Sequence, residues 1–307
     1  MVPPAEAWAQ GQDLVRRNPH GDPMLRRLGR GMRKGIGASA AGQARELARL
    51  TAQLGAPVPS CRRIVVTSVR GGAGKSTIAA LVAGVIRRHR DDRVIAIDAD
   101  PGLGSLPLRL DVRGARSLRD LAAARPQSWD ETAAFLTRTE EGLWVLPAHS
   151  ERKLGGDLDD EIFRAGAGRL GRYFSTSVID CGAGLVSGLQ RGVLSGAHAQ
   201  VFVAPGTTDG AASARAALGW FAQNGHGPLL SRTVIALVAH TPSPGAELER
   251  AAEELSAAGL LVVHIPYDRH LAAGIAITPE RVGGAARDAA TLIAAEAFAR
   301  SLSGGAT

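Results

Sequence analysis

The residues best suited to chemistry lie in one run, Val65–Thr77, where an apolar, β-branched segment leads through a glycine-rich loop into Gly-Lys-Ser-Thr and then a helical pattern. Glycines let backbone N–H groups turn inward around phosphate oxygens, and the following helix directs the positive end of its dipole to the same place. In this context Lys75 would reach the β- and γ-phosphates of a nucleotide, and the Ser76 hydroxyl would ligate Mg²⁺. The predicted phosphate-binding residues are therefore Gly71, Gly72, Ala73, Gly74, Lys75, Ser76 and Thr77.

Carboxylates end two further apolar segments. Asp98 and Asp100 come at the end of one segment, and Asp180 ends another and is followed four residues later by Gly184. An acidic side chain at the end of a buried strand is unfavourable unless it meets a cation or water. Two such loops downstream of a phosphate-binding loop indicate a nucleotide and metal site, with a helix or turn cap as the alternative role of Asp98.

Apolar segments alternate with Ala- and Leu-rich helical patterns along the rest of the chain. Further strands are expected at Arg93–Asp98, Leu143–Leu146, Ser177–Asp180, Gln200–Ala204, Thr233–Val238 and Leu260–Ile265. Helices are expected between most of them, for example at Gly210–Gln223, Ala246–Ala258 and Ala285–Leu302. This alternation predicts an α/β fold with a doubly wound, mostly parallel sheet covered by helices on both faces. Such sheets bind ligands beyond the carboxyl ends of their strands, where the carboxylates occur.

The composition allows one large domain with an extension. The chain has 307 residues, of which 45% are hydrophobic, and contains no continuous apolar run of about 18 residues that predicts a spanning helix. Its N-terminus lacks the basic and apolar regions of a signal peptide. Two cysteines, Cys61 and Cys181, have no metal-ligand spacing and fit a reducing compartment. The expected location is therefore cytoplasmic.

Most of the net charge of +7 lies at the start of the chain. Residues 1–60 hold nine basic and four acidic residues. The segment Arg16–Gly37 is rich in Arg, Gly and Pro, which predicts a mobile basic arm, and Ala40–Leu54 carries a helical pattern. We expect a basic, partly disordered extension with one helix at 1–59 and a nucleotide-binding domain at 60–307. The arm would contact a partner protein, nucleic acid or anionic lipid, or remain a solvated tail.

The phosphate-binding loop departs from the strict motif in that Val69 replaces its first glycine and Arg70 stands at its start. This resembles the deviant loop of the MinD/ParA ATPases, in which a lysine at this position reaches across a dimer to the partner's nucleotide. The resemblance implies ATP and Mg²⁺ as cofactors and a homodimer that forms with ATP. It also implies catalytic roles for Lys75 and for Arg70, whose guanidinium can make a forked contact with phosphate.

The two carboxylate loops resemble the switch segments of the same family. The resemblance implies that Asp100, the aspartate before the proline, is catalytic and orients or activates the attacking water. Asp98 would support the magnesium shell, and Asp180 would hold Mg²⁺ through water. Gly184 would present its N–H to the γ-phosphate.

The base-binding region follows the family pattern only in part. Related ATPases commonly carry an asparagine after the sixth strand, where this chain has Ala239 followed by His240. The loop Ile265–His270 matches the family's position beside the base, which implies Pro266 and Asp268 as nucleotide-binding residues. Adenine specificity is therefore implied by the resemblance and not by a base-reading side chain.

Several segments together resemble one branch more closely, the EspI-type ATPases of actinobacterial type VII (ESX) secretion loci. They are Asp98–Gly104, Asp180–Gly184, Arg191–Ser195, Asp209-Gly210, Leu218–Trp220 and Pro266–Gly274. This resemblance implies an ATP-driven dimerisation switch that regulates or assists protein secretion. Its basic arm would bind a secretion-system protein or substrate, and it would be recruited to a membrane-bound secretion complex.

Two other functions remain open on sequence grounds. A ParA-type partition or cargo-positioning ATPase would bind DNA through arginines, which the basic arm permits. A small-molecule phosphoryl-transfer enzyme would need a second pocket of paired histidines and carboxylates, and none is evident. A membrane role of the MinD type is disfavoured because the C-terminal end has mixed charge and few basic residues.

Overall fold

The computed structural model describes residues 40–303 except 103, 151–157, 186, 244 and 258. The expected basic arm, Arg16–Gly37, therefore lies outside the described residues. Of the described residues, those from Arg49 onward form one compact unit, and residues 40–48 lie outside it. No helix in the described part of the chain is both long and apolar enough to cross a bilayer.

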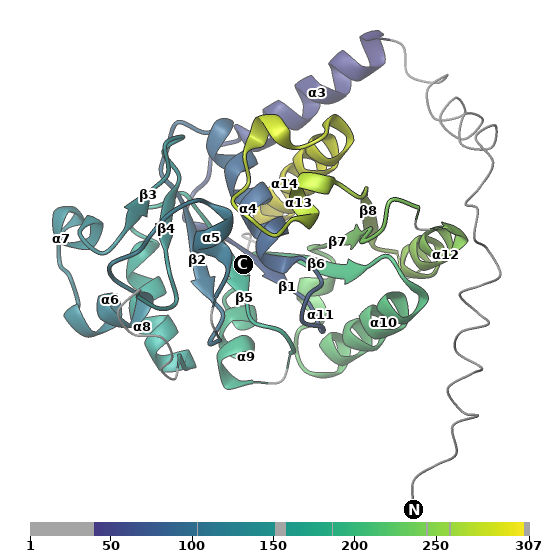
Figure 1. Ribbon diagram of the computed structural model, residues 1–307. Helices are drawn as coiled ribbons and strands as arrows, with labels where there is room; N and C mark the ends of the chain where they lie inside the picture. Colours follow the sequence, from purple (N-terminus) through teal and green to yellow (C-terminus); the bar gives the residue numbers. More distant parts are fainter. Residues whose placement is uncertain are drawn as a thin grey trace, which may run out of the picture. The chain divides into compact units, whose positions relative to one another are not determined.

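The described residues form one eight-stranded sheet in the order β3-β4-β2-β5-β1-β6-β7-β8 (Figure 1). The strands are β1 (Arg62–Thr67), β2 (Val94–Ala99), β3 (Thr137–Arg138), β4 (Trp144–Leu146), β5 (Thr176–Cys181), β6 (Ala199–Pro205), β7 (Thr233–Val238) and β8 (Leu261–Ile265). Neighbours within this described sheet pair in parallel, except for β3 with β4. The central strands are apolar and buried on both faces, as parallel strands require.

Helices cover both faces of the sheet (Figure 1). The longer ones are α3 (Ala40–Leu54), α4 (Lys75–Arg88), α8 (Asp160–Leu170), α9 (Gly188–Ser195), α10 (Thr208–Gln223), α12 (Gly245–Ser256) and α14 (Gly284–Ser303). The shorter ones are α5 (Leu106–Arg109), α6 (Leu118–Ala124), α7 (Trp129–Ala133), α11 (Gly227–Leu230), α13 (Arg269–Ala272) and the 3₁₀ turn η2 (Pro279–Arg281).

Side chains of the central strands alternate between two hydrophobic cores. In β1, Ile64 and Val66 pack in the core that holds α4 and α14, whereas Val65 packs in the core that holds α6, α8, α9, α10 and α12. This two-sided arrangement is what an alternating strand and helix pattern produces. The predicted doubly wound α/β fold is therefore confirmed.

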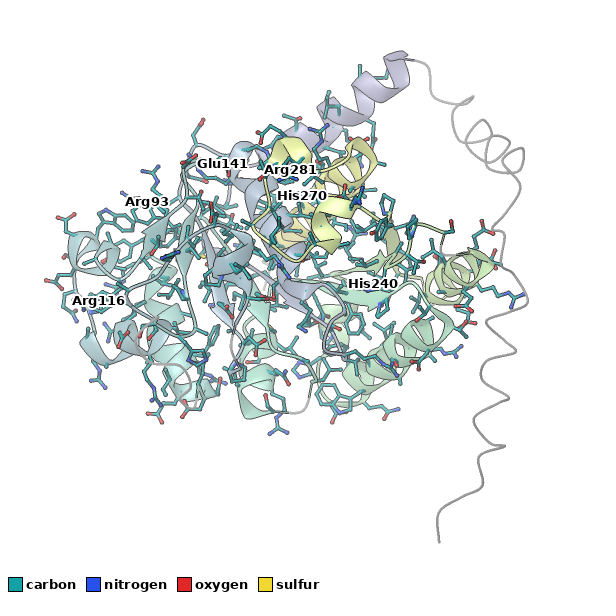
Figure 2. The ribbon with its side chains drawn as sticks, viewed as in Figure 1. Arg93, Arg116, Glu141, His240, His270 and Arg281 are labelled. Carbon is teal, nitrogen blue, oxygen red and sulfur yellow. The ribbon has the colours of Figure 1, made fainter. Side chains whose placement is uncertain are left out.

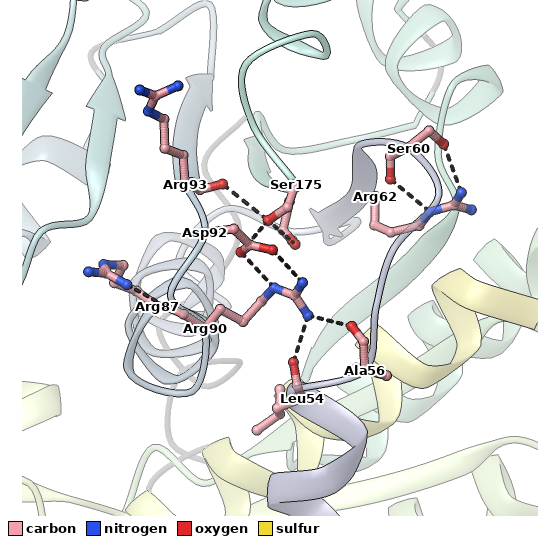
Figure 3. A network of polar contacts seen from close by, with 10 residues as sticks. Leu54, Ala56, Ser60, Arg62, Arg87, Arg90, Asp92, Arg93 and Ser175 are labelled. Carbon is pink, nitrogen blue, oxygen red and sulfur yellow. Dashed lines mark hydrogen bonds and ion pairs between the residues drawn. The ribbon is translucent and has the colours of Figure 1, made fainter.

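A buried arginine holds the segment that leads into β1 (Figure 3). Arg90 donates from Nη1 to the carbonyl oxygens of Leu54 and Ala56, each at 2.8 Å, and forms a forked pair with Asp92 through Nε and Nη2. Burial alone would raise the pKa of Asp92, but hydrogen bonds from Arg90 and Ser175 lower it below its usual value. The end of α3 is thus tied to the sheet, although the predicted domain begins only at residue 60.

We expect Leu54→Ala to lower the free energy of unfolding by about 2–5 kcal/mol, because a fully buried leucine leaves a cavity when truncated. Thr51→Ala provides the control, since this exposed position on the same helix should change stability by less than about 0.5 kcal/mol. Urea denaturation followed by circular dichroism measures both. Equal, small effects would mean that the last turn of α3 does not stabilise the folded unit.

Candidate nucleotide-binding site

The loop between β1 and α4 exposes a helix N-terminus. Gly72 and Gly74 have φ values of 75° and 95°, a left-handed backbone that glycine adopts without steric cost. Helix α4 begins at Lys75 and has no acidic residue in its first turn. Because the first N–H groups of a helix have no partner within the helix, this end is suited to bind an anion.

A cavity of about 250 Å³ opens beside this loop. Its predicted lining residues are Gly71, Gly72, Gly74, Lys75, Ser76, Thr77 and Asp100, and three more residues join them, Ser105, Arg109 and Ala183. The remaining predicted loop residue, Ala73, is fully buried and packs in the core with α4. The fold therefore brings the predicted phosphate loop and the predicted water-orienting carboxylate to one place.

Two buried carboxylates stand side by side near this cavity. Asp98 on β2 and Asp180 on β5 are register partners and are 1% and 0% exposed. Asp98 Oδ1 accepts a hydrogen bond from the Asp100 N–H at 2.9 Å, so the predicted cap role is also present. Asp98 Oδ2 and both carboxylate oxygens of Asp180 have no well-formed hydrogen bond among the described residues, although the Ser76 hydroxyl lies close enough to Asp180 to lower its pKa. Buried oxygens of this kind are suited to a cation or water.

The electrostatics of the pair follow from this burial. Burial and the neighbouring charge of Asp180 raise the pKa of Asp98 well above its usual value. Burial also raises the pKa of Asp180, and the Ser76 hydroxyl and the Lys75 ammonium act in the opposite direction. Asp180 therefore lies in reach of the two loop residues predicted to hold phosphate and metal.

The predicted magnesium ligands fit a metal that is bound mainly through phosphate and water. Among the residues that the structure describes, no three His, Cys, Asp or Glu side chains form a metal-binding group. Mg²⁺ retains several waters and commonly takes one or two protein ligands plus substrate phosphates. Ser76 at the cavity wall, with Asp180 and Asp98 behind it, supplies a donor set of that kind.

The two carboxylate loops lie against each other. Asp100 Oδ1 accepts a hydrogen bond from the Gly102 N–H at 2.9 Å, and a Cβ at Gly182 would lie 3.1 Å from the same oxygen. The Gly184 N–H donates to the Ser68 carbonyl at 3.1 Å. The predicted contact of Gly184 with the γ-phosphate would therefore replace this hydrogen bond.

A second cavity of about 70 Å³ shares Gly74 and Thr77 with the first. Its other lining residues include Pro266 and Asp268, which are predicted to bind the nucleotide, and Ala239 and His240, which stand where related ATPases carry an asparagine. The two shared residues place the cavities next to each other. No asparagine side chain lines this cavity within the described part of the chain.

Polar side chains around the smaller cavity mainly hold the protein together. The Asp268 carboxylate accepts hydrogen bonds from the N–H groups of Leu271 at 2.9 Å and Gly283 at 2.7 Å. His270 on α13 accepts one from the Thr278 N–H at 2.9 Å, and His240 lies exposed after β7 (Figure 2). Asp268 therefore shapes the cavity wall, and its predicted contact with the nucleotide stays a prediction.

Arg70 precedes the first lining residue, Gly71, and does not itself line the larger cavity. Its guanidinium pairs with Asp209 of α10, with Nη2 to Oδ1 at 2.8 Å, and Nε donates to Ser213 Oγ at 3.1 Å. The Arg70 and Asp209 side chains are 49% and 67% exposed. Its predicted contact with the phosphate of a second subunit stays a prediction.

Sequence reasoning assigned no role to three residues of the larger cavity, Ser105, Arg109 and Ala183. Ser105 precedes the short helix α5 and Arg109 is its last residue, and this helix is too brief to show a periodic pattern. The one available signal was an arginine within the otherwise apolar run Leu106–Leu110.

Residues 64–276 match the family model described as CbiA, the CobQ/CobB/MinD/ParA nucleotide binding domain. The chain belongs to this nucleotide-binding family. The matched range contains the phosphate loop, both carboxylate loops and the wall of the base-side cavity. The predicted resemblance to MinD/ParA proteins is therefore confirmed.

Comparison with individual proteins also shows similarity to EspI and MinD. The chain is 34% identical to the ESX-1 secretion-associated protein EspI of Mycobacterium tuberculosis over 221 residues, which cover 70% of this chain and 33% of EspI. It is 28% identical to the septum site-determining protein MinD of Synechocystis over 144 residues, 47% of this chain and 53% of MinD. The match therefore spans about a third of the length of EspI and about half that of MinD.

Solved structures of the family share the fold. A ParA family ATPase from Chlorobium tepidum aligns with a TM-score of 0.64 and 19% identity, covering 76% of this chain and 98% of that one. The MinC:MinD complex of Aquifex aeolicus aligns with a TM-score of 0.60 and 18% identity, with 80% and 97% coverage. Cobyrinic acid a,c-diamide synthase of Mycobacterium smegmatis, with bound ADP and magnesium, aligns at 0.54 and 19%, with 76% and 92% coverage.

Proposed function

We propose that the chain binds Mg-ATP in the larger cavity, hydrolyses it, and alternates between a monomer and an ATP-bound homodimer. The observation that carries this proposal is the buried pair Asp98 and Asp180, whose unsatisfied oxygens lie near a cavity lined by a phosphate-binding loop. Burying two adjacent carboxylates costs free energy, which the nearby Lys75 ammonium offsets in part and a bound cation would offset further. Membership of a nucleotide-binding family supports the same ligand class.

The proposed chemistry assigns one task to each group. Lys75 and the N-terminus of α4 neutralise the phosphates, and Ser76 and Asp180 would hold Mg²⁺, which supplies further positive charge at the phosphate oxygens. Asp100 has one carboxylate oxygen engaged by Gly102, so the other is available to orient the attacking water.

The proposed dimer depends on Arg70. Both side chains of its ion pair with Asp209 are exposed, and such pairs contribute about 0–1 kcal/mol to the stability of the fold. A forked contact with a triphosphate is stronger than that, since both partners carry full charge and several donors and acceptors meet. Arg70 would therefore exchange Asp209 for the nucleotide of a second copy at little cost.

We expect wild-type protein with Mg-ATP to double its mass in light scattering, and Arg70→Ala to bind ATP yet stay monomeric. Arg215→Ala is the matched control, because Arg215 also lies on the surface, 64% exposed, in an ion pair with Glu254. This control should dimerise as wild type does. A wild-type protein that stays monomeric at saturating Mg-ATP would contradict the dimer and leave Arg70 without a role in trans.

The proposed biological role is control of type VII secretion through ATP-dependent binding of a partner. The support is the 34% identity to EspI, with the partner-binding task assigned to the basic residues of the first 60 positions. The same basic residues favour DNA-dependent partition as a second candidate. DNA binding that weakens steeply with salt would favour partition, and ATP-dependent capture of a secretion component without DNA binding would favour secretion. In either role the proposed location is the cytoplasm, with recruitment to a membrane complex in the first.

A further inference from the structure

We propose that Arg109 is a second cation of the nucleotide site, which binds the γ-phosphate within the same protomer. This inference rests on the proposed binding of ATP in the larger cavity. Arg109 is the last residue of α5, and it lines the cavity together with Lys75, Ser76 and Asp100. Two cations would then meet the triphosphate inside one protomer, independently of Arg70.

The guanidinium of Arg109 has few protein partners. No carboxylate forms an ion pair with it in the described part of the chain. Among the described residues its side chain makes a single long hydrogen bond, from Nη1 to the Ile275 carbonyl at 3.4 Å, and its buried Nε finds no acceptor there. Because an arginine carries five N–H donors, most of them remain available for an anion. A half-buried cation without an ion-pair partner in this part of the chain, at the wall of a cavity of about 250 Å³, points to an anionic ligand.

The backbone around Arg109 fixes where this cation lies. The Arg109 carbonyl accepts a hydrogen bond from the Ile277 N–H at 2.9 Å, which ties α5 to the segment after α13. A Cβ at Gly274, where φ is 70°, would lie 3.5 Å from both Nη atoms, so the guanidinium rests along this glycine. The side chain is therefore directed by packing and not by a salt bridge.

The neighbours of Arg109 indicate the terminal phosphate. Gly74 and Thr77 line both cavities, so the base-side end of the nucleotide lies near them. Asp100, Ser105 and Ala183 line the larger cavity and not the smaller one, and Asp100 is the residue proposed to orient the water that attacks the γ-phosphate. A forked guanidinium there matches the geometry of a terminal phosphate.

The test compares the affinities of ATP and ADP by isothermal titration with Mg²⁺. Arg109→Gln should weaken ATP binding roughly 10- to 100-fold, the range expected for a lost charged contact, and should change ADP binding less than about threefold. Arg109→Lys should recover part of the ATP preference because it retains the charge. The control is Arg88→Gln, which removes the same charge from an exposed residue that shares only the neighbouring pocket with Arg109.

Three results would overturn the inference. Unchanged ATP affinity in a folded Arg109→Gln protein would exclude the contact. Equal losses for ATP and ADP, or an equal loss of ATP affinity in Arg88→Gln, would exclude a specific contact with the γ-phosphate. If wild-type protein itself fails to bind ATP, the proposed function fails instead. Melting temperatures of the nucleotide-free variants show whether each has folded.

Discussion

Replacing Lys75 by alanine is expected to weaken Mg-ATP binding at least 10- to 100-fold, since charged hydrogen bonds contribute about 1.5–3 kcal/mol each. Lys75 is 8% exposed, begins α4 and lines the larger cavity, so its ammonium is held in the cavity wall and not spread into solvent. A buried ammonium also carries a desolvation cost that a phosphate would offset.

Titration of labelled ATP with Mg²⁺ onto Lys75→Ala and Lys75→Met measures this effect. The methionine variant keeps most of the side-chain volume, so a loss shared by both variants isolates the charge from packing. Circular dichroism checks that both proteins fold, because either change removes a charge that partly compensates the buried Asp180. Undiminished affinity in both would refute the assignment of the loop to phosphate binding.

Asp100→Ala is expected to bind Mg-ATP with near wild-type affinity and to hydrolyse it about 10²- to 10⁴-fold more slowly, the usual range for losing a positioned acid–base group. The phosphates and metal are assigned to other residues, so only the orientation of water is lost. If the proposed switch is correct, this variant accumulates as a dimer in light scattering because its nucleotide persists.

Single-turnover hydrolysis of labelled ATP provides the measurement. Asp91→Ala serves as the control, because this exposed carboxylate precedes β2 whereas Asp100 follows it. Wild-type turnover in Asp100→Ala would transfer the catalytic role to another group. Loss of ATP binding in the same variant would indicate a structural role for Asp100 in closing its loop.

The sheet could be predicted because each strand is recognisable from a short, local stretch of the sequence. Each of the six strands expected after the loop lies within one residue of its counterpart in the structure, since a parallel strand buried on both faces reads as a short apolar run. Helices α10, α12 and α14 could be predicted for a similar reason, because each is long enough to show the hydrophobic repeat of a helix. The two-residue strand β3 and helices of four to seven residues, such as α5 and α6, have too few turns to do so.

The residues of the site also fall into those that local sequence predicts and those that it does not. The phosphate loop, Asp98, Asp100 and Asp180 follow directly from strands, so their meeting at one sheet edge follows from the fold class. Arg109 and Asp209 reach their places through tertiary contacts, with the segment at Gly274 and with Arg70 respectively. The spacing of residues in the sequence does not predict such tertiary contacts.

The adjacent carboxylates Asp98 and Asp180 have a consequence for how long the protein survives. Like charges or shared protons in the core oppose folding, and the proposed metal–nucleotide complex would relieve that opposition only in the folded state. If that proposal holds, the empty protein is the less stable form and opens more often to proteases, whose action follows the population of open states. A fall in nucleotide supply would then lower the abundance of the protein as well as its occupancy.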